Sequence, residues 1–239
     1  MLESLHLDDD DEEAQPAGIH PRTRSEAITV NFLINFLNGV ALELHPHSVR
    51  PSFASVSEQT CFVFGPSPKR QMATGSYRAH VDGYMYNLPS RAGESNNGDP
   101  NQVRRLFLYE VKPVAYTRTS SDVQDALLRQ VTAELAAWAY TRLEELLGQC
   151  QRSNLPVYLP TIVQTQDESW LFIGVCHQDY LLYIRNPDAP VVPADDLIME
   201  TSMLQIHFFG RYSLYSREHM LSLVAFVVAQ MRSQLAAFR

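Results

Sequence analysis

The spacing of apolar residues along the first half of the chain predicts one helix followed by strands. The helix is expected from about Ser25, with apolar side chains at helical spacing until an Asn-Gly pair at 38–39 offers a stop. Two β-rich stretches follow, at 53–64 and 77–86, and the strongest strand pattern lies at 104–114. This order is typical of a helix packed on a three-strand meander.

The second half begins with a long predicted helix. Ser121 and Gln124 have the spacing of a capping box, and Gly148 fits the stop. The apolar stripe of this helix consists of Val123, Leu127, Val131, Leu135 and Trp138. Strands are expected at 157–165, 170–175, 180–184 and 204–214, before a last helix at 217–237. Because a helix connects the third strand to the fourth, the pattern predicts an α/β protein with a mixed central sheet, flanked by helices and ending in a C-terminal helix.

Composition divides the chain into a tail and one domain. Residues 1–16 hold seven Asp and Glu residues and no Lys or Arg, and they account for all but one of the formal net charge of −8. Residues 1–20 are therefore predicted to be an acidic, disordered tail, and residues 21–239 a single domain. The remaining domain is close to neutral, so its charge alone does not require a nucleic-acid partner.

Hydropathy and cysteine usage indicate where the protein works. The most apolar stretch, Leu221–Ala229, is too short to span a bilayer, and the first residues lack the pattern of a secretory signal. An intracellular protein of the nucleus or cytoplasm, without a membrane partner, is expected. The three cysteines, Cys61, Cys150 and Cys176, have no metal-finger spacing and are expected to be reduced and buried.

Three charged residues form the strongest candidate site. Glu110 and Lys112 are two apart on a predicted strand, so their side chains share a face at roughly 7 Å. Asp82 lies on the preceding strand, where it can come opposite Glu110. A divalent cation between two such carboxylates removes their repulsion, whereas a structural alternative is an ordinary cross-strand ion pair. Lysine is scarce in this chain, since only Lys69 and Lys112 occur among 19 basic residues, which makes Lys112 more informative.

Three sequence segments carry a resemblance to a known family. They are RAHVDGY at 78–84, LFLYEVKP at 106–113 and QVTAELAAW at 130–138. Together they resemble the PD-(D/E)XK nuclease superfamily and, more narrowly, the PD-(D/E)XK nuclease-like domains of many uncharacterised fungal proteins. The resemblance covers about residues 22–185.

The resemblance implies a restriction-endonuclease-like core and a set of roles. Asp82 matches the motif Asp and Glu110 the acidic member of (D/E)XK, and both are expected to bind Mg²⁺ or Mn²⁺. Lys112 matches the motif Lys, and Gln130 the Gln that many members carry on the following helix, so these two complete the catalytic set. Glu26 matches an acidic residue that some members place near the metal.

Two positions depart from the family pattern. Val81 stands where the motif name has Pro, as is common in the superfamily. Glu134 stands where several nuclease subfamilies have Tyr, four residues after the Gln. Gln130 and Glu134 lie one turn apart on the same helix face. Gln130 is expected to be functional, and Glu134 to be solvated beside the apolar stripe.

Two functions are compatible with these residues. The intact Asp, Glu and Lys favour a metal-dependent nuclease that hydrolyses phosphodiester bonds, of DNA in preference to RNA. The near-neutral domain favours an inactive nuclease-fold binding or interaction module. Arg78 and His80 alternate with Asp82 and Tyr84, so all four are expected on one face of their strand. There, Arg78 and His80 either contact a phosphate or form a polar solvent face.

Overall fold

The computed structural model describes residues 24–44, 53–64, 77–87, 105–112, 121–186 and 201–236. The elements in chain order are α1 (Arg24–Leu44), β1 (Phe53–Val56), β2 (Thr60–Phe64), β3 (Tyr77–Val81), β4 (Gly83–Asn87), β5 (Arg105–Val111), α2 (Ser121–Thr141), α3 (Leu143–Ser153), β6 (Val157–Gln164), β7 (Glu168–Cys176), α4 (Gln178–Arg185), β8 (Gln205–Ser213) and α6 (Arg217–Ala236). The predicted acidic tail, at residues 1–20, lies outside the described residues.

The central sheet is mixed, as the sequence predicts. Its six strands follow the order β1-β4-β5-β6-β7-β8, while β2 and β3 form a separate two-stranded sheet. The β5–β6 pair is parallel, and the other pairs of the large sheet are antiparallel. Helices α2 and α3 lie between β5 and β6 in the chain and provide the crossover that a parallel pair requires.

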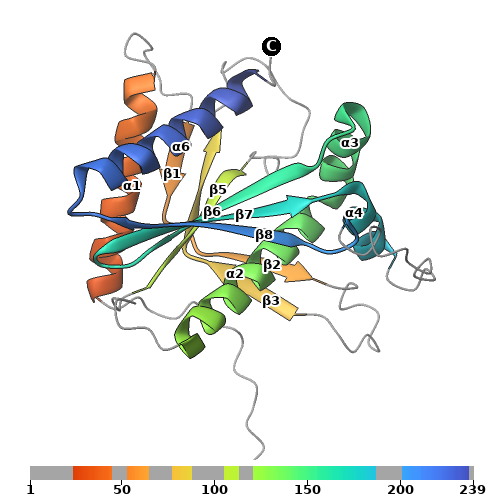
Figure 1. The fold of residues 1–239 in the computed structure, drawn as a ribbon, viewed down its shortest axis with the longest axis horizontal. Helices are drawn as coiled ribbons and strands as arrows, with labels where there is room; N and C mark the ends of the chain where they lie inside the picture. Colours follow the sequence, from red (N-terminus) through yellow and green to blue (C-terminus); the bar gives the residue numbers. More distant parts are fainter. Residues whose placement is uncertain are drawn as a thin grey trace, which may run out of the picture.

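Helices cover both faces of this sheet (Figure 1). One apolar cluster joins the sheet to α1 and α6, and the other joins it to α2, α3 and α4. Side chains of β5 alternate between them: Phe107, Tyr109 and Val111 belong to the first cluster and Leu108 to the second. By the same alternation Glu110 projects toward α2, from the most buried strand of the fold.

The predicted meander is interrupted by two breaks. Residues 57–59 separate β1 from β2, and a bend at Asp82 separates β3 from β4, so the small β2–β3 sheet leaves the main one. The prediction that Arg78, His80, Asp82 and Tyr84 share a face is wrong. Arg78 and His80 are exposed, whereas Asp82 and Tyr84 are buried, because the chain changes sheets at the bend.

Several predicted helix boundaries also need correction. Residues 180–184 form part of helix α4 and not a strand, since Tyr180, Leu181 and Ile184 are buried at helical spacing. Helix α1 continues past Gly39 to Leu44. Asn38 does not stop it, because its side chain accepts a hydrogen bond from the Ser55 N–H at 2.8 Å.

The predicted long helix is two helices, α2 and α3, which meet at Arg142. The second ends at Asn154 in a left-handed conformation, and not at Gly148. Strand β8 and helix α6 are confirmed near their predicted bounds. Of the three cysteines, Cys150 and Cys176 are buried and free as expected, whereas Cys61 is free and exposed.

Helix α1 is the one described helix that is long and apolar enough to cross a membrane by length and composition, over Glu26–Leu44 with a mean hydropathy of 1.5. It packs on the sheet through a stripe of buried side chains at helical spacing. These are Val30, Leu33, Leu37 and Ala41. The helix thus packs through one face, and 28% of its most apolar window is buried. The nuclear or cytoplasmic location stays an expectation.

Candidate metal centre and catalytic residues

Asp82 is fixed at the bend between β3 and β4. Its carboxylate is buried, and Oδ2 accepts a hydrogen bond of 2.7 Å from the Val111 N–H. The next residue, Gly83, pairs with Tyr109 of β5, and a Cβ there would overlap the Tyr109 hydroxyl and the Val56 carbonyl. Only a residue without a side chain allows this close approach of the two strands. The close approach holds Asp82 against the strand that carries Glu110.

Glu110 and Lys112 lie at the carboxyl end of β5. Glu110 is buried, and its Oε1 receives the Lys112 ammonium at 2.6 Å. The Lys112 side chain keeps 20% of its surface exposed, so it forms the boundary between the buried carboxylate and solvent. The backbone N–H of Lys112 donates to the Gln164 carbonyl at 2.8 Å, which joins this end of β5 to β6.

Helix α2 covers the cluster on the face of the sheet opposite α1. The Gln130 amide nitrogen, Nε2, donates to Glu110 Oε1 at 2.7 Å and to Glu134 Oε1 at 2.8 Å. One amide therefore bridges two carboxylates. The prediction that Glu134 is solvated is wrong, because its side chain is only 1% exposed. Its place between Val131 and Trp138 of the apolar stripe is the sequence signal for this burial.

The cluster concentrates negative charge in a buried place. Burial, together with repulsion by Asp82, raises the pKa of Glu110 to about 7, although Lys112 and Gln130 act in the opposite direction. Burial and the charge of Glu110 raise the pKa of Glu134 well above its ordinary value. Three carboxyl groups thus lie around a single ammonium, which leaves the cluster short of positive charge.

The donor set suits a hard divalent cation. Oε2 of Glu110 and Oε2 of Glu134 are both buried without a hydrogen-bond partner. Within the described residues, no group of three His, Cys, Asp or Glu side chains is arranged to hold a metal ion. Mg²⁺ commonly binds through one or two carboxylates and completes its shell with waters and substrate phosphate oxygens. Asp82 and Glu110 fit that mode.

The three supporting candidates, Glu26, Arg78 and His80, come from other elements than the buried cluster. Glu26 is half-buried in the first turn of α1, a helix that packs on the opposite face of the sheet from α2. Arg78 and His80 are exposed on β3. The structure thus brings together Asp82, Glu110, Lys112 and Gln130, and it adds Glu134 to them.

These observations define an α/β protein with a mixed six-stranded sheet and a buried acidic cluster at the end of β5. In comparisons with known proteins, no family model matches the chain, and no curated protein matches it. The functional assignment therefore depends on the chemistry of the cluster.

Proposed function

We propose that this chain is a metal-dependent hydrolase of phosphodiester bonds in nucleic acid, with a core like that of the PD-(D/E)XK nucleases. The observation that carries the proposal is the convergence of Asp82, Glu110 and Lys112 at one end of β5. Asp82 is hydrogen-bonded to the backbone of that strand, and Lys112 lies on the Glu110 carboxylate. Gln130 joins them from the facing helix.

The oxygens of Asp82 and Glu110 would hold Mg²⁺ or Mn²⁺. When bound, such a cation supplies Lewis acidity and makes a coordinated water more acidic. Gln130 and Lys112 both engage Oε1 of Glu110, which leaves the unpartnered Oε2 for a ligand. Gln130 is in this way a positioning residue for the Glu110 carboxylate.

Lys112 is placed to assist the reaction itself. Its ammonium, on a side chain that is 20% exposed, can orient a water and offset the negative charge that develops on the phosphate. In the hydrolysis, the water oxygen bonds to phosphorus and the bond to the leaving oxygen breaks. The proton lost by the water ends on the leaving oxygen or in solvent.

An ordinary ion pair explains the cluster less well. A structural pair needs one carboxylate and one ammonium, and burying further carboxylates costs several kcal/mol per ion unless each is compensated. Here Asp82 and Glu134 are buried beside the Glu110–Lys112 pair. Without a cation, the raised pKa values of Glu110 and Glu134 favour their neutral forms, whereas a bound cation would favour the ionised forms.

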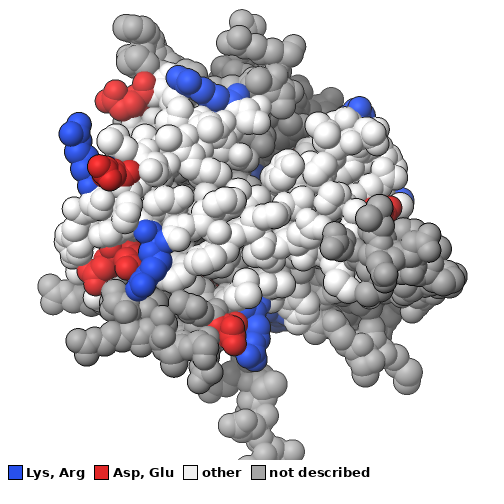
Figure 2. Space-filling model, viewed as in Figure 1, with Lys and Arg blue, Asp and Glu red and all other residues white. Residues whose placement is uncertain are grey.

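An inactive binding module is the second candidate. It is favoured by the charge pattern of the face shown in Figure 2, where Lys and Arg lie interspersed with Asp and Glu. The described residues of that face form no continuous basic track for a nucleic-acid backbone. Turnover distinguishes the two candidates.

The decisive experiment uses the purified full chain with single- and double-stranded DNA and RNA, in Mn²⁺ or in chelator. Lys112→Ala is expected to abolish cleavage and to leave calorimetric Mn²⁺ binding nearly unchanged. Asp82→Ala is expected to remove both. Glu144→Ala is the matched control, because that exposed carboxylate pairs with Arg185 away from β5.

Two results would contradict the nuclease assignment. The first is the absence of cleavage of every substrate by the wild-type chain, and the second is Mn²⁺ binding that does not depend on Asp82. A chain that binds nucleic acid without cutting it would instead support the binding module.

A further inference from the structure

A concave feature lies at the same end of the sheet as the candidate metal centre. It is an open hollow of about 460 Å³, within the size range of ligand-binding clefts. Its walls come from the amino-terminal half of α1 and from the segment between β8 and α6. Among the residues that line it are Ile28, Phe32, Gln164, Leu214 and Tyr215.

The floor of the hollow is connected to the catalytic strand. Gln164 pairs with Val111 in the parallel β5–β6 ladder, and its carbonyl accepts the Lys112 N–H. Neighbouring strands are about 5 Å apart. The hollow and the candidate metal centre therefore adjoin the ends of two neighbouring strands, on opposite faces of the sheet.

The lining of the hollow includes aromatic side chains that are strongly exposed to solvent. Tyr215 is 83% exposed and Phe32 is 45% exposed, and Ile28 also presents most of its side chain to solvent. Large exposed side chains that gather around a hollow mark a binding surface more often than a folding requirement. Flat rings are the groups on which nucleobases stack.

Tyr215 is held in place despite its exposure. Its hydroxyl donates to Asp167 Oδ1 at 2.9 Å, and its backbone N–H donates to Ser213 Oγ at 3.3 Å. The preceding residue is also fixed, because the Leu214 N–H donates to the Asp167 carbonyl at 2.9 Å. The ring is thus a pre-formed platform, and little conformational entropy would be lost when a ligand stacks on it.

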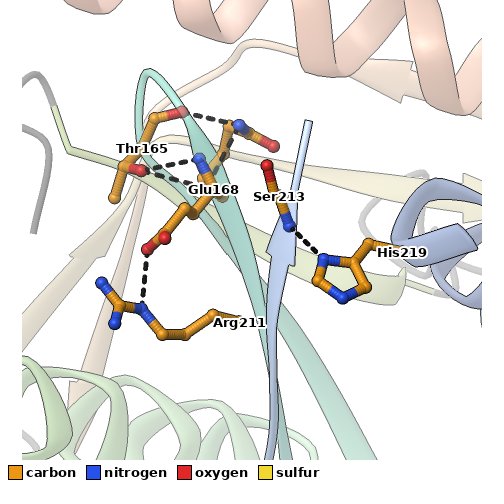
Figure 3. A network of polar contacts seen from close by, with 6 residues as sticks. Thr165, Glu168, Arg211, Ser213 and His219 are labelled. Carbon is orange, nitrogen blue, oxygen red and sulfur yellow. Dashed lines mark hydrogen bonds and ion pairs between the residues drawn. The ribbon is translucent and has the colours of Figure 1, made fainter. Parts of the chain in front are cut away.

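Figure 3 shows the polar network that supports this wall. In the turn after β6, the Glu168 N–H donates to Thr165 Oγ1 at 3.1 Å, and the Glu168 carboxylate accepts Arg211 Nε at 3.0 Å. On the other side, the Ser213 N–H donates to His219 Nδ1 at 3.0 Å. The turn, β8 and the start of α6 are in this way joined into one rigid support.

The polar group at the floor is already satisfied. Gln164 is fully buried; its amide donates to the Thr165 carbonyl at 2.6 Å, and its oxygen accepts the Ser169 hydroxyl. It therefore offers no free edge for reading a base by hydrogen bonds. The lining also includes Thr29 and Gln166, but most of it is apolar or aromatic, so a ligand here is recognised mainly by stacking and apolar contact, which tolerate any base.

We infer that this hollow holds one unstacked nucleobase of the nucleic acid whose phosphodiester is cut at Glu110 and Lys112, so that the substrate is single-stranded and is bound without sequence preference. The part of this inference that concerns cleavage at Glu110 and Lys112 rests on the proposed function. A paired base is stacked inside a duplex and presents no ring face to Tyr215 or Phe32.

The test measures binding in chelator by fluorescence anisotropy, with a short labelled single-stranded DNA of mixed sequence and the matching duplex. Wild type is expected to prefer the single strand. Tyr215→Ala and Phe32→Ala are each expected to weaken single-strand binding roughly tenfold, and Tyr215→Phe to retain most of it. Leu42→Ala is the matched control, because Leu42 is an exposed apolar residue at the other end of α1.

Two outcomes overturn the inference: equal binding of the two probes by wild type, or unchanged single-strand binding by both alanine variants. Either outcome would favour an apolar protein segment, and not a nucleobase, as the ligand of the hollow. Tyr215 is 83% exposed, so Tyr215→Ala should melt at the same temperature as wild type, whereas Phe32→Ala also removes a ring stacked on Phe36 and should melt somewhat lower. The proposed hydrolysis is read separately from Mn²⁺-dependent cleavage and its loss in Lys112→Ala, so either idea can fail while the other stands.

Discussion

The two faces of strand β5 differ in what they bury. Toward α1 and α6 the strand presents Phe107, Tyr109 and Val111, all packed in an apolar cluster. Toward α2 it presents Leu108 and then Glu110, which is equally inaccessible but charged and surrounded by further carboxyl groups. The first face stabilises the fold by removing apolar surface from water. The second lowers stability when its carboxyl groups are ionised, because burial disfavours the charged form.

The largest expected effect on stability comes from a substitution on the apolar face of β5. Phe107→Ala should lower the free energy of unfolding by about 3–5 kcal/mol, because it leaves a cavity in a fully buried position. Glu110→Gln, on the other face, should cost far less in chelator, since it removes a buried charge while keeping the shape. Urea denaturation of both variants measures the difference. Equal losses would mean that Glu110 is a structural ion-pair partner.

The pH dependence of stability sharpens the same contrast. The pKa of Glu110 is raised to about 7 in the folded protein, so the folded state binds this proton more tightly than the unfolded chain does. Metal-free protein should therefore be most stable near pH 4–5 with respect to this group. It should lose up to ~3 kcal/mol as the pH rises through 7.

Glu110→Gln should reduce that pH dependence, because the amide does not titrate and the raised pKa of Glu134 alone remains. The measurement compares urea midpoints of wild type and variant at pH 5 and pH 8 in chelator. A variant that loses as much stability as wild type between these two values would assign the effect to another group.

Adding a cation should offset the loss of stability that the buried carboxyl groups cause. Mn²⁺ at a hundredfold excess over its dissociation constant would stabilise the folded chain by about 2.7 kcal/mol if it binds the folded state alone. Asp82→Ala should remove this gain, whereas Phe107→Ala should keep it on a lower baseline. Thermal melts with and without Mn²⁺ give both numbers. A gain that persists in Asp82→Ala would place the cation elsewhere.

The contrast also explains which parts of the molecule could be predicted from the sequence. The β5 pattern is strong because every position after Arg105 is buried, and the two-residue period puts Glu110 and Lys112 on one face without any tertiary information. The mixed sheet follows from the helical crossover between β5 and β6. These features depend on local periodicity, which the sequence displays directly.

The features that the sequence does not predict depend on tertiary contacts. Glu134 was assigned to solvent because it is charged, although it lies three residues after Val131 and four before Trp138, which is core spacing. The bend at Asp82 left no clear signal beyond Gly83, because the following residues continue an extended pattern in another sheet. Helix α4 is short, and its apolar residues fit either period.

The smallest effects concern two glycines in different surroundings. Gly39→Ala, in the middle of α1, adds a methyl group with no atom within 4 Å and should stabilise the chain by about 0.5–1 kcal/mol. Gly83→Ala pushes a methyl group into Tyr109 and the Val56 carbonyl and should cost about 1–3 kcal/mol. It should also weaken Mn²⁺ binding, because separating the start of β4 from β5 disturbs the Asp82–Val111 hydrogen bond. Denaturation and calorimetry on the pair test this link. If Gly83→Ala loses stability but keeps full Mn²⁺ affinity, the close approach at Gly83 serves the fold alone.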